Sequence, residues 1–191
     1  SPYTTGLMDK FFDNVLIPLT HTTRGCPFTC TFCSEGNKYY QKVAQRETLE
    51  DELRYIAERR GTVPDLALSD ANFGMFSQDA EKAQNLRKIR DETGWPQRLV
   101  VSTGKNQKER IIEVAQALDG MLSVAASLQS TNSEVLKNIK RSNISLDALQ
   151  TMVSEATAAE STTYTEIILN LPGDTQERHF DSIRDVTDRG L

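Results

Sequence analysis

The chain has 191 residues, a length that fits one domain with a sizeable hydrophobic core. Its net charge is −5 and no block of basic residues stands out, so composition argues against a nucleic-acid partner. No apolar run is long enough to cross a bilayer, and no signal-peptide pattern opens the chain. We therefore expect a soluble, cytoplasmic protein that does not engage a membrane.

The first 13 residues carry apolar side chains at helical spacing. Thr5 would cap a short helix, and one face of that helix would carry Leu7, Met8, Phe11 and Phe12. Such a face usually packs against the domain that follows. Because the chain starts abruptly, we expect residues 1–13 to be a linker or docking segment from an absent upstream domain, and residues 14–191 to form the main domain.

Five short apolar runs alternate with segments of helical periodicity. The predicted strands are residues 14–19, 66–68, 99–101, 122–126 and 166–169. Strands that are apolar throughout and separated by helices are typical of parallel sheets covered on both faces. The sequence therefore predicts an α/β fold of about five parallel βα units with outer helices.

All three cysteines of the chain follow the first predicted strand, at Cys26, Cys30 and Cys33. An iron–sulfur cubane normally takes four thiolates, one for each iron, so three thiolates on one loop would leave one iron free to bind a small molecule. Two alternatives stay open for the same cysteines. One is a disulfide with a spare thiol, and the other is a zinc site in which His21 joins the three thiols.

The pattern Cys-x-x-x-Cys-x-Phe-Cys closely resembles the signature of the radical S-adenosylmethionine (SAM) enzymes. This resemblance implies that Cys26, Cys30 and Cys33 hold a [4Fe–4S] cluster whose open iron chelates SAM, and that Phe32 lies against the adenine. It also implies a partial TIM barrel of the (β/α)6 type. Since only about five units are present, we expect the chain to be truncated before a sixth strand.

Small polar residues follow each predicted strand, and parallel α/β folds bind their ligands at that end of the sheet. In the family, the segment after the second strand binds the SAM amino group. Here that segment departs from the usual Gly-Gly-Glu, and its candidate residues are Ser69, Asp70 and Asn72. An Asx turn leading into Gly74 is the structural alternative for the aspartate and the asparagine.

Further family positions contact the ribose and the methionine part of SAM. The residues at these positions are Ser102, Ser127 and Gln129, and Arg141 corresponds to an arginine that reaches the SAM carboxylate or ribose. Serines at strand ends also commonly cap helices or form turns, and an arginine at a helix end is often only solvated. No catalytic residue for the substrate's own chemistry can be named from the sequence.

The resemblance implies an enzyme that reductively cleaves SAM to a 5′-deoxyadenosyl radical, which abstracts hydrogen from a small-molecule substrate. A flavodoxin or ferredoxin would supply the electron. The N-terminal segment resembles the linker that follows a cobalamin-binding domain in the B12-dependent subgroup, so we expect a cobalamin-dependent methylation or rearrangement, with cobalamin held by an absent domain.

Two further functions stay open at this point. One is a methylthiotransferase of the same superfamily, and the other is a zinc-binding or non-catalytic scaffold. An exposed last strand would also favour self-association of the chain, because unpaired strand edges template pairing.

Overall fold

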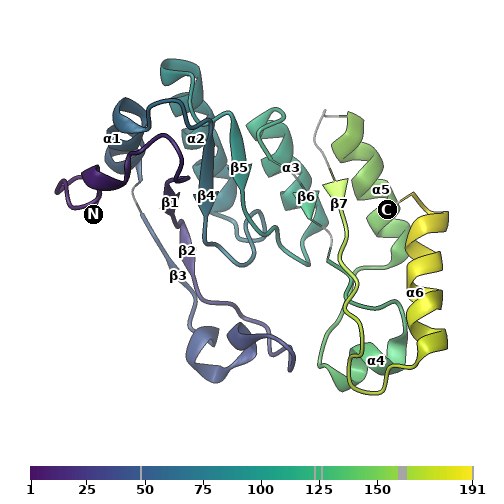
Figure 1. Ribbon diagram of the computed structural model, residues 1–191. Helices are drawn as coiled ribbons and strands as arrows, with labels where there is room; N and C mark the ends of the chain where they lie inside the picture. The colour runs from purple at the N-terminus through teal and green to yellow at the C-terminus, as the bar shows by residue number, and fades with distance from the viewer. Residues whose placement is uncertain (48, 123, 126, 159–162, 191) are drawn as a thin grey trace.

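The computed structural model describes residues 1–47, 49–122, 124–125, 127–158 and 163–190, and strands and helices alternate along it (Figure 1). The parallel strands are β1 (Leu19–Thr20), β4 (Asp65–Leu68), β5 (Arg98–Val100), β6 (Val124–Ala125) and β7 (Thr163–Tyr164). The helices are α1 (Glu50–Arg59), α2 (Asp79–Thr93), α3 (Lys108–Leu118), α4 (Ser133–Asn138), α5 (Leu146–Ala158) and α6 (Gln176–Asp188). The shorter elements are the antiparallel pair β2 (Thr23–Arg24) and β3 (Ala44–Gln45), and the 3-10 turns η1 (Asp9–Phe11), η2 (Ser34–Gly36) and η3 (Lys38–Gln41).

The strands follow one another in the order β1-β4-β5-β6-β7. Parallel ladders join β1 to β4, β4 to β5, and β6 to β7. The two parts of the sheet meet where the backbone N–H of Leu99 donates to the carbonyl of Met121 (2.8 Å) and Leu99 bridges Leu122 in parallel. This arrangement confirms the predicted α/β fold of parallel βα units with outer helices.

The hydrophobic core fills the space between the sheet and its helices. Its fully buried members include Ile56 of α1, Leu66 of β4, Leu86 of α2 and Leu118 of α3. Burial of one such side chain contributes about 1.5–3 kcal/mol, so the apolar periodicity of the helices is enough to dock them on the sheet. None of the helices in the described part of the chain is long and apolar enough to span a membrane.

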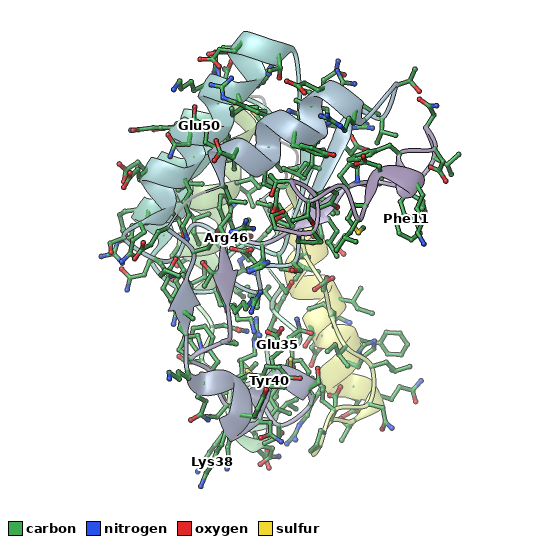
Figure 2. All side chains as sticks on the ribbon, turned by 90° about the vertical axis from the view of Figure 1, so that its left-hand side faces the viewer. Phe11, Glu35, Lys38, Tyr40, Arg46 and Glu50 are labelled. Atoms are coloured by element: carbon green, nitrogen blue, oxygen red, sulfur yellow. The ribbon has the colours of Figure 1, made fainter. Side chains whose placement is uncertain are left out.

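The N-terminal segment differs from the predicted amphipathic helix. Only the single turn η1 forms, because Gly6 adopts a left-handed φ of +76° just before it. Met8 and Phe12 pack against the core, whereas Leu7 is 70% exposed. Figure 2 shows Phe11 pointing away from the body of the molecule.

The first predicted strand is also largely wrong. Its three central apolar residues, Val15, Leu16 and Ile17, are exposed, and β1 begins only at Leu19. The reason is local: the Asp13 carboxylate accepts hydrogen bonds from the backbone N–H groups of Val15 and Leu16 (both 2.9 Å) and so forms a turn.

The later predicted strands are closer to the observed ones. Strands β4 and β5 fall within one residue of their predicted ranges, and β6 lies inside 122–126, of which positions 123 and 126 lie outside the described residues. The fifth strand was predicted at 166–169, yet β7 ends at Tyr164 and only parallel backbone contacts between Gln129 and residues 166–168 continue it. Glu166 was therefore predicted inside the fifth strand, but it lies after the end of β7.

Candidate functional site

The cysteine loop leaves the sheet through β2 and returns through β3. Glycine is required at two points of this loop. At Gly25 (φ +90°) a Cβ atom would lie 2.6 Å from the carbonyl oxygen of Tyr40, and at Gly36 it would lie 2.0 Å from that of Cys30. The backbone N–H of Cys26 also donates to the Tyr40 carbonyl (2.8 Å). These contacts fold the loop tightly around its own thiols.

The three thiols are free, and those of Cys26 and Cys30 are buried. The disulfide alternative therefore finds no support. Among the described residues, no three His, Cys, Asp or Glu side chains converge as the ligands of a single metal ion would. His21 instead accepts a hydrogen bond from Nε of Arg24 (2.9 Å), so the zinc alternative lacks its ligand set. In a cubane, by contrast, each thiolate binds a different iron.

A cleft opens beside the thiols at the carboxyl ends of the strands. It encloses about 1050 Å³, open solvent included. The predicted site residues that line it are Cys26, Phe32, Cys33, Ser69, Asp70, Ser102, Ser127 and Gln129. The fold thus gathers residues that lie up to about a hundred positions apart in the sequence, as parallel strands predict.

The remaining predicted residues lie directly behind this lining. Nδ2 of Asn72 donates to the sulfur of Cys26 (3.2 Å). Arg141 donates through Nη2 to the backbone carbonyl of Ser127 and faces Cys30. Burial lowers the pKa of Arg141, while the negative charge available on Cys30 acts in the opposite direction. Together with Cys30 itself, these two side chains support the wall that the thiols share with the cleft.

Several buried polar atoms here have no partner among the described residues. They are Oδ1 of Asn72, Oε1 of Gln129 and Nη1 of Arg141. A buried polar atom without a hydrogen bond costs about 1–3 kcal/mol, so the free oxygen of Gln129 in the cleft wall suits a ligand that supplies the missing partner. SAM has matching groups, since its ammonium and hydroxyls donate and its carboxylate accepts. The donor set therefore fits both the cluster and SAM.

Asp70 has a structural role that the sequence did not reveal. Its carboxylate accepts from the backbone N–H (2.7 Å) and the hydroxyl (2.5 Å) of Thr22, just before the cysteine loop. The alternative of an Asx turn into Gly74 is therefore not how this side chain is used. Asp70 still lines the cleft, and a carboxylate can accept further hydrogen bonds.

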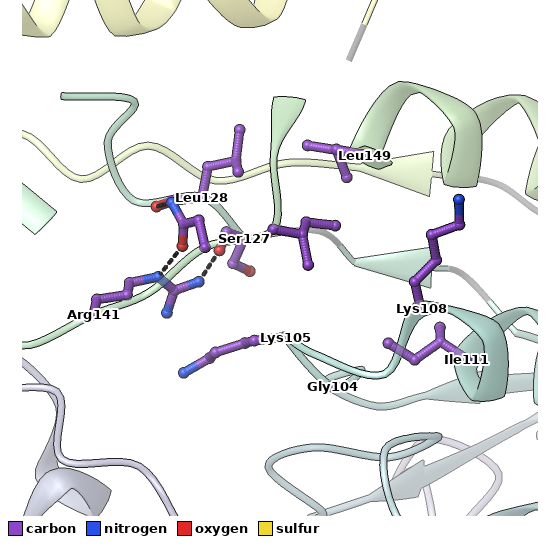
Figure 3. Close-up of a pocket in the computed structure, with 10 residues that line it drawn as sticks. Gly104, Lys105, Lys108, Ile111, Ser127, Leu128, Arg141 and Leu149 are labelled. Atoms are coloured by element: carbon purple, nitrogen blue, oxygen red, sulfur yellow. Dashed lines mark hydrogen bonds between the residues drawn. The ribbon is translucent and has the colours of Figure 1, made fainter. Parts of the chain in front are cut away.

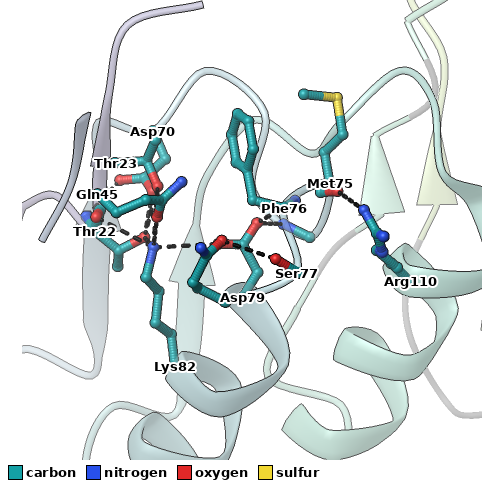
Figure 4. A network of polar contacts seen from close by, with 12 residues as sticks. Thr22, Thr23, Gln45, Asp70, Met75, Phe76, Ser77, Asp79, Lys82 and Arg110 are labelled. Atoms are coloured by element: carbon teal, nitrogen blue, oxygen red, sulfur yellow. Dashed lines mark hydrogen bonds and ion pairs between the residues drawn. The ribbon is translucent and has the colours of Figure 1, made fainter. Parts of the chain in front are cut away.

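A buried polar network fixes the stem of the cysteine loop to helix α2 (Figure 4). The Lys82 ammonium contacts the hydroxyls of Thr22 (3.2 Å) and Thr23 (3.1 Å), the side-chain oxygen of Gln45, and Oδ1 of Asp79 (3.2 Å). Burial raises the pKa of Asp79, against the opposing effects of its hydrogen bonds and of Lys82. One cation thus joins β2, β3 and α2 beneath the site.

Phe32, Ser69 and Ser102 make contacts of their own, outside the Lys82 network. The ring of Phe32, in the cleft lining, packs against a small second core formed by Val135, Ile139 and Leu171. The Ser69 hydroxyl donates to the Thr20 carbonyl (3.3 Å), and Ser102 lies exposed at the rim. Both serines therefore lie at strand ends, as predicted.

Sequence reasoning missed three charged residues of the cleft, Glu35, Lys105 and Glu166. Glu166 was placed inside the fifth strand, but it follows β7 and accepts a hydrogen bond from the Ser127 hydroxyl (2.5 Å). A correct strand boundary would have identified it by the same strand-end rule. Lys105 follows the third predicted strand, so the strand-end rule also applies to it. A single lysine at that position did not by itself indicate a ligand site.

Comparison with known proteins decides the family. The sequence profile of the Radical SAM superfamily matches residues 20–186, most of the chain. The chain belongs to the radical SAM superfamily. This confirms the assignment made from the cysteine loop, and with it the expectation that the chain is part of an enzyme.

Curated relatives point to one branch of the radical SAM superfamily. The chain is 34% identical over 201 residues to the cobalamin-dependent radical SAM methyltransferase TokK of Streptomyces tokunonensis, and 33% identical to a 2-(S-pantetheinyl)-carbapenam-3-carboxylate methyltransferase of Streptantibioticus cattleyicolor. Both alignments take in 100% of this chain but 29% of the relative. The chain thus spans less than a third of the length of these relatives.

Solved structures share the radical SAM fold. The methyltransferase TsrM of Kitasatospora setae, with tryptophan and a SAM analogue bound, has a TM-score of 0.78 at 16% identity and covers 95% of this chain and 35% of its own. Methylornithine synthase has a TM-score of 0.61 at 15% identity, with 98% of this chain and 55% of its own covered. These similarities confirm the partial-barrel fold.

Proposed function

We propose that this chain is a radical SAM core that holds a [4Fe–4S] cluster on Cys26, Cys30 and Cys33 and binds SAM in the adjacent cleft. The observation that carries the proposal is the cleft lined by Cys26 and Cys33, with an unpartnered buried oxygen of Gln129 in its wall and two further unpartnered polar atoms, on Asn72 and Arg141, behind that wall. When bound, the reduced cluster supplies the electron that cleaves SAM to a 5′-deoxyadenosyl radical.

The chain's own residues would bind, orient and shield these groups. The free oxygens of Asn72 and Gln129 suit the ammonium and the ribose hydroxyls, and the free Nη1 of Arg141 suits a carboxylate or a thiolate. Asp70 can accept a further hydrogen bond from the ammonium, with Ser69 beside it. Ser102 and Ser127 would contact the ribose and methionine part, and Phe32 would lie along the adenine.

The reaction class we propose is cobalamin-dependent methyl transfer to a small-molecule substrate. It is supported by the alignment of the whole chain with the methyltransferases TokK and the Streptantibioticus enzyme. Cobalamin would be held outside this sequence, and the apolar side chains of residues 1–13 would serve as the link to that part. A flavodoxin or ferredoxin would deliver the electron.

The first test is anaerobic iron and sulfide reconstitution, followed by dithionite reduction with SAM and chromatography of the products. We expect about four irons per chain and formation of 5′-deoxyadenosine. A Cys30→Ala variant should lose both, whereas Thr31→Ala, at an exposed residue of the same loop that does not line the cleft, should keep both. A cluster that forms without any cleavage of SAM would reject the proposed activity.

Methyl transfer needs a second readout, in a longer protein that includes the proposed cobalamin-binding part and is loaded with cobalamin. A SAM molecule that gives up its methyl group becomes S-adenosylhomocysteine, so this product should appear beside 5′-deoxyadenosine. If 5′-deoxyadenosine forms alone with cobalamin bound, the core chemistry stands and the methyl-transfer assignment is wrong.

A further inference from the structure

Lys82 is a buried cation that lies outside the lining of the cleft. Its side chain is 12% exposed, and five oxygen atoms surround its ammonium: the carbonyl and the hydroxyl of Thr22 (both 3.2 Å), the hydroxyl of Thr23 (3.1 Å), Oε1 of Gln45, and Oδ1 of Asp79 (3.2 Å) (Figure 4). All three of its hydrogens therefore have protein acceptors, and none is left for a ligand. Any effect of Lys82 on the cleft has to pass through its neighbours.

Arg141 is a buried cation of a different kind. Its Nε donates to Oδ1 of Asn143 (2.7 Å) and its Nη2 donates to the carbonyl of Ser127 (Figure 3). Its Nη1 has no partner among the described residues. Arg141 can therefore meet a ligand directly, whereas Lys82 can act only through the residues that it holds.

The hydroxyl of Thr22 connects Lys82 to Asp70. This hydroxyl accepts from the Lys82 ammonium (3.2 Å) and donates to Oδ2 of Asp70 (2.5 Å), while the backbone N–H of Thr22 donates to Oδ1 (2.7 Å). Both oxygens of the Asp70 carboxylate are thus bound to one residue, which Lys82 contacts in turn. Asp70 lines the cleft and is 3% exposed, so this chain of contacts fixes how its carboxylate faces a ligand.

Asp79 connects Lys82 to the loop that follows β4. Its Oδ1 contacts the ammonium (3.2 Å), and its Oδ2 accepts hydrogen bonds from the backbone N–H groups of Gly74 (2.8 Å) and Phe76 (3.0 Å). The same loop carries Asn72, two residues before Gly74. One ammonium therefore supports two neighbouring segments that the proposed function assigns to SAM.

We infer that Lys82 is a positioning residue for SAM. It holds Asp70 in the cleft wall through Thr22, and it holds the loop after β4 through Asp79. This inference rests on the proposed function, because it takes the SAM ammonium as the group that Asp70 and Asn72 receive. It makes the affinity for SAM depend on a side chain that SAM does not touch.

The sign of the effect separates positioning from simple electrostatic attraction. SAM carries a sulfonium, an ammonium and a carboxylate, so its net charge is positive. Removing the positive charge of Lys82 would by itself attract SAM more strongly. Loss of positioning acts in the opposite direction, because Asp70 and the loop after β4 would no longer be held where SAM meets them.

The first test is Lys82→Met in the cluster-loaded chain, with SAM binding measured by anaerobic calorimetry. The Kd for SAM should rise about tenfold or more. Lys88→Met, at an exposed lysine of the same helix, should leave the Kd unchanged. An unchanged or lower Kd for SAM in Lys82→Met overturns the inference.

Two adjacent threonines allow smaller changes that keep the charge of Lys82. The hydroxyls of Thr22 and Thr23 both contact Lys82, but that of Thr22 donates to Asp70 and that of Thr23 donates to Gln45. Thr22→Val should therefore raise the Kd for SAM about fivefold, and clearly more than Thr23→Val does. Equal effects of the two variants overturn the link to Asp70.

Hydrogen exchange in the cluster-free chain tests the two connections without SAM. In Lys82→Met, the backbone amides of Thr22, Gly74 and Phe76 should exchange at least about tenfold faster, because the carboxylates that accept from them are less firmly held. Amides in the middle of α2 should keep their rates, which shows that the variant is folded. Unchanged exchange at all three amides overturns the inference, and if α2 also exchanges faster, the threonine pair decides.

These readouts separate the inference from the proposed function. If the unchanged, cluster-loaded chain binds no SAM, the proposed function is rejected, and hydrogen exchange still decides whether Lys82 holds the two segments. If SAM is bound and cleaved with the same Kd in every variant, the inference alone is rejected.

Discussion

Asn72 shows how much one side chain contributes at this site. Its amide nitrogen donates to the sulfur of Cys26, while its oxygen has no hydrogen-bond partner among the described residues. Hydrogen bonds to ligand sulfurs are among the factors that set the reduction potential of an iron–sulfur cluster, because they stabilise the more negative, reduced form. Asn72 would therefore act on the cluster and on SAM at once.

This dual role predicts two effects of Asn72→Leu, a change that keeps the side-chain shape. The cluster potential should become more negative, and the rate of 5′-deoxyadenosine formation should fall about tenfold or more. Potentiometric titration followed by electron paramagnetic resonance measures the first effect. Asn85→Leu, on the exposed side of α2, is the control. An unchanged potential would show that the N–H···S contact has no electronic role.

Gly36 gives a purely steric prediction, because its φ is not in the left-handed region. The Cβ of Gly36→Ala would collide with the Cys30 carbonyl, so the Cys30 thiol should shift and the iron content should fall well below four per chain. Gly94→Ala is the matched control: it introduces strain at φ +70° but meets no atom within 4 Å. Full cluster loading of Gly36→Ala would mean that the loop adjusts freely.

At the scale of elements, polar side chains tie the cysteine loop to the sheet and to the helices. Lys82 joins α2 to β2 and β3 beneath the site. Glu52 of α1 does the same on the other side: it accepts from Arg46 (2.9 Å) and from the hydroxyl of Thr20 in β1. The loop is therefore positioned by buried charges rather than by its own secondary structure.

Glu52 makes the fold sensitive to acid. Burial by itself raises the pKa of Glu52, but hydrogen bonds from Arg46, Ser1 and Thr20 outweigh it and bring the value from 4.5 down to about 2. Because the folded-state pKa lies below the unfolded one, this stabilisation is complete above about pH 5 and is lost as the pH falls toward 2. It amounts to about 3 kcal/mol.

Urea unfolding of the cluster-free chain at steps between pH 6 and pH 2 measures this contribution. Glu52→Gln should show a smaller loss of unfolding free energy over that range than the unchanged chain. Glu50→Gln, which alters an exposed carboxylate of the same helix, should follow the unchanged chain. If all three proteins lost the same unfolding free energy between pH 6 and pH 2, Glu52 would not be the source of the acid sensitivity.

At the scale of the whole molecule, an apolar surface lies next to the outer strand of the sheet, whose Leu19 backbone is hydrogen-bonded by the Tyr3 hydroxyl. Strand β1 is the outer strand of its sheet, and Val15, Leu16, Ile17 and Leu19 beside it are 44–77% exposed. Exposed apolar patches favour association. Self-association was predicted from the last strand; the exposed apolar side chains of residues 15–19 are a further surface for it.

Ile17→Lys should reduce this association. We expect the chain of residues 1–191 to form dimers or larger species at high concentration in static light scattering, and the variant to shift toward monomer. Leu7→Lys, at an exposed residue outside this segment, is the control. A clean monomer of the unchanged chain at every concentration would contradict the prediction.

The correct and the wrong strand predictions each have a cause in particular residues. Strands β4 and β5 were predicted because Leu66 and Leu99 lie in apolar runs that the core buries. The run Val15–Ile17 has the same composition, yet the neighbouring Asp13 carboxylate turns the backbone there. Glu166 was misassigned for a different reason, since the end of β7 depends on long-range pairing with β6 rather than on its own sequence.

The amino-acid sequence by itself determined the cysteine loop and the order of the βα units, because the spacing of Cys26, Cys30 and Cys33 and the apolar periods are local properties of the chain. Only the tertiary structure decided which polar atoms remain unpaired. Asn72, Gln129 and Arg141 come from three separate loops, and whether each finds a partner depends on packing across the sheet. The same holds for Lys105, which the fold brings into the cleft beside the thiols.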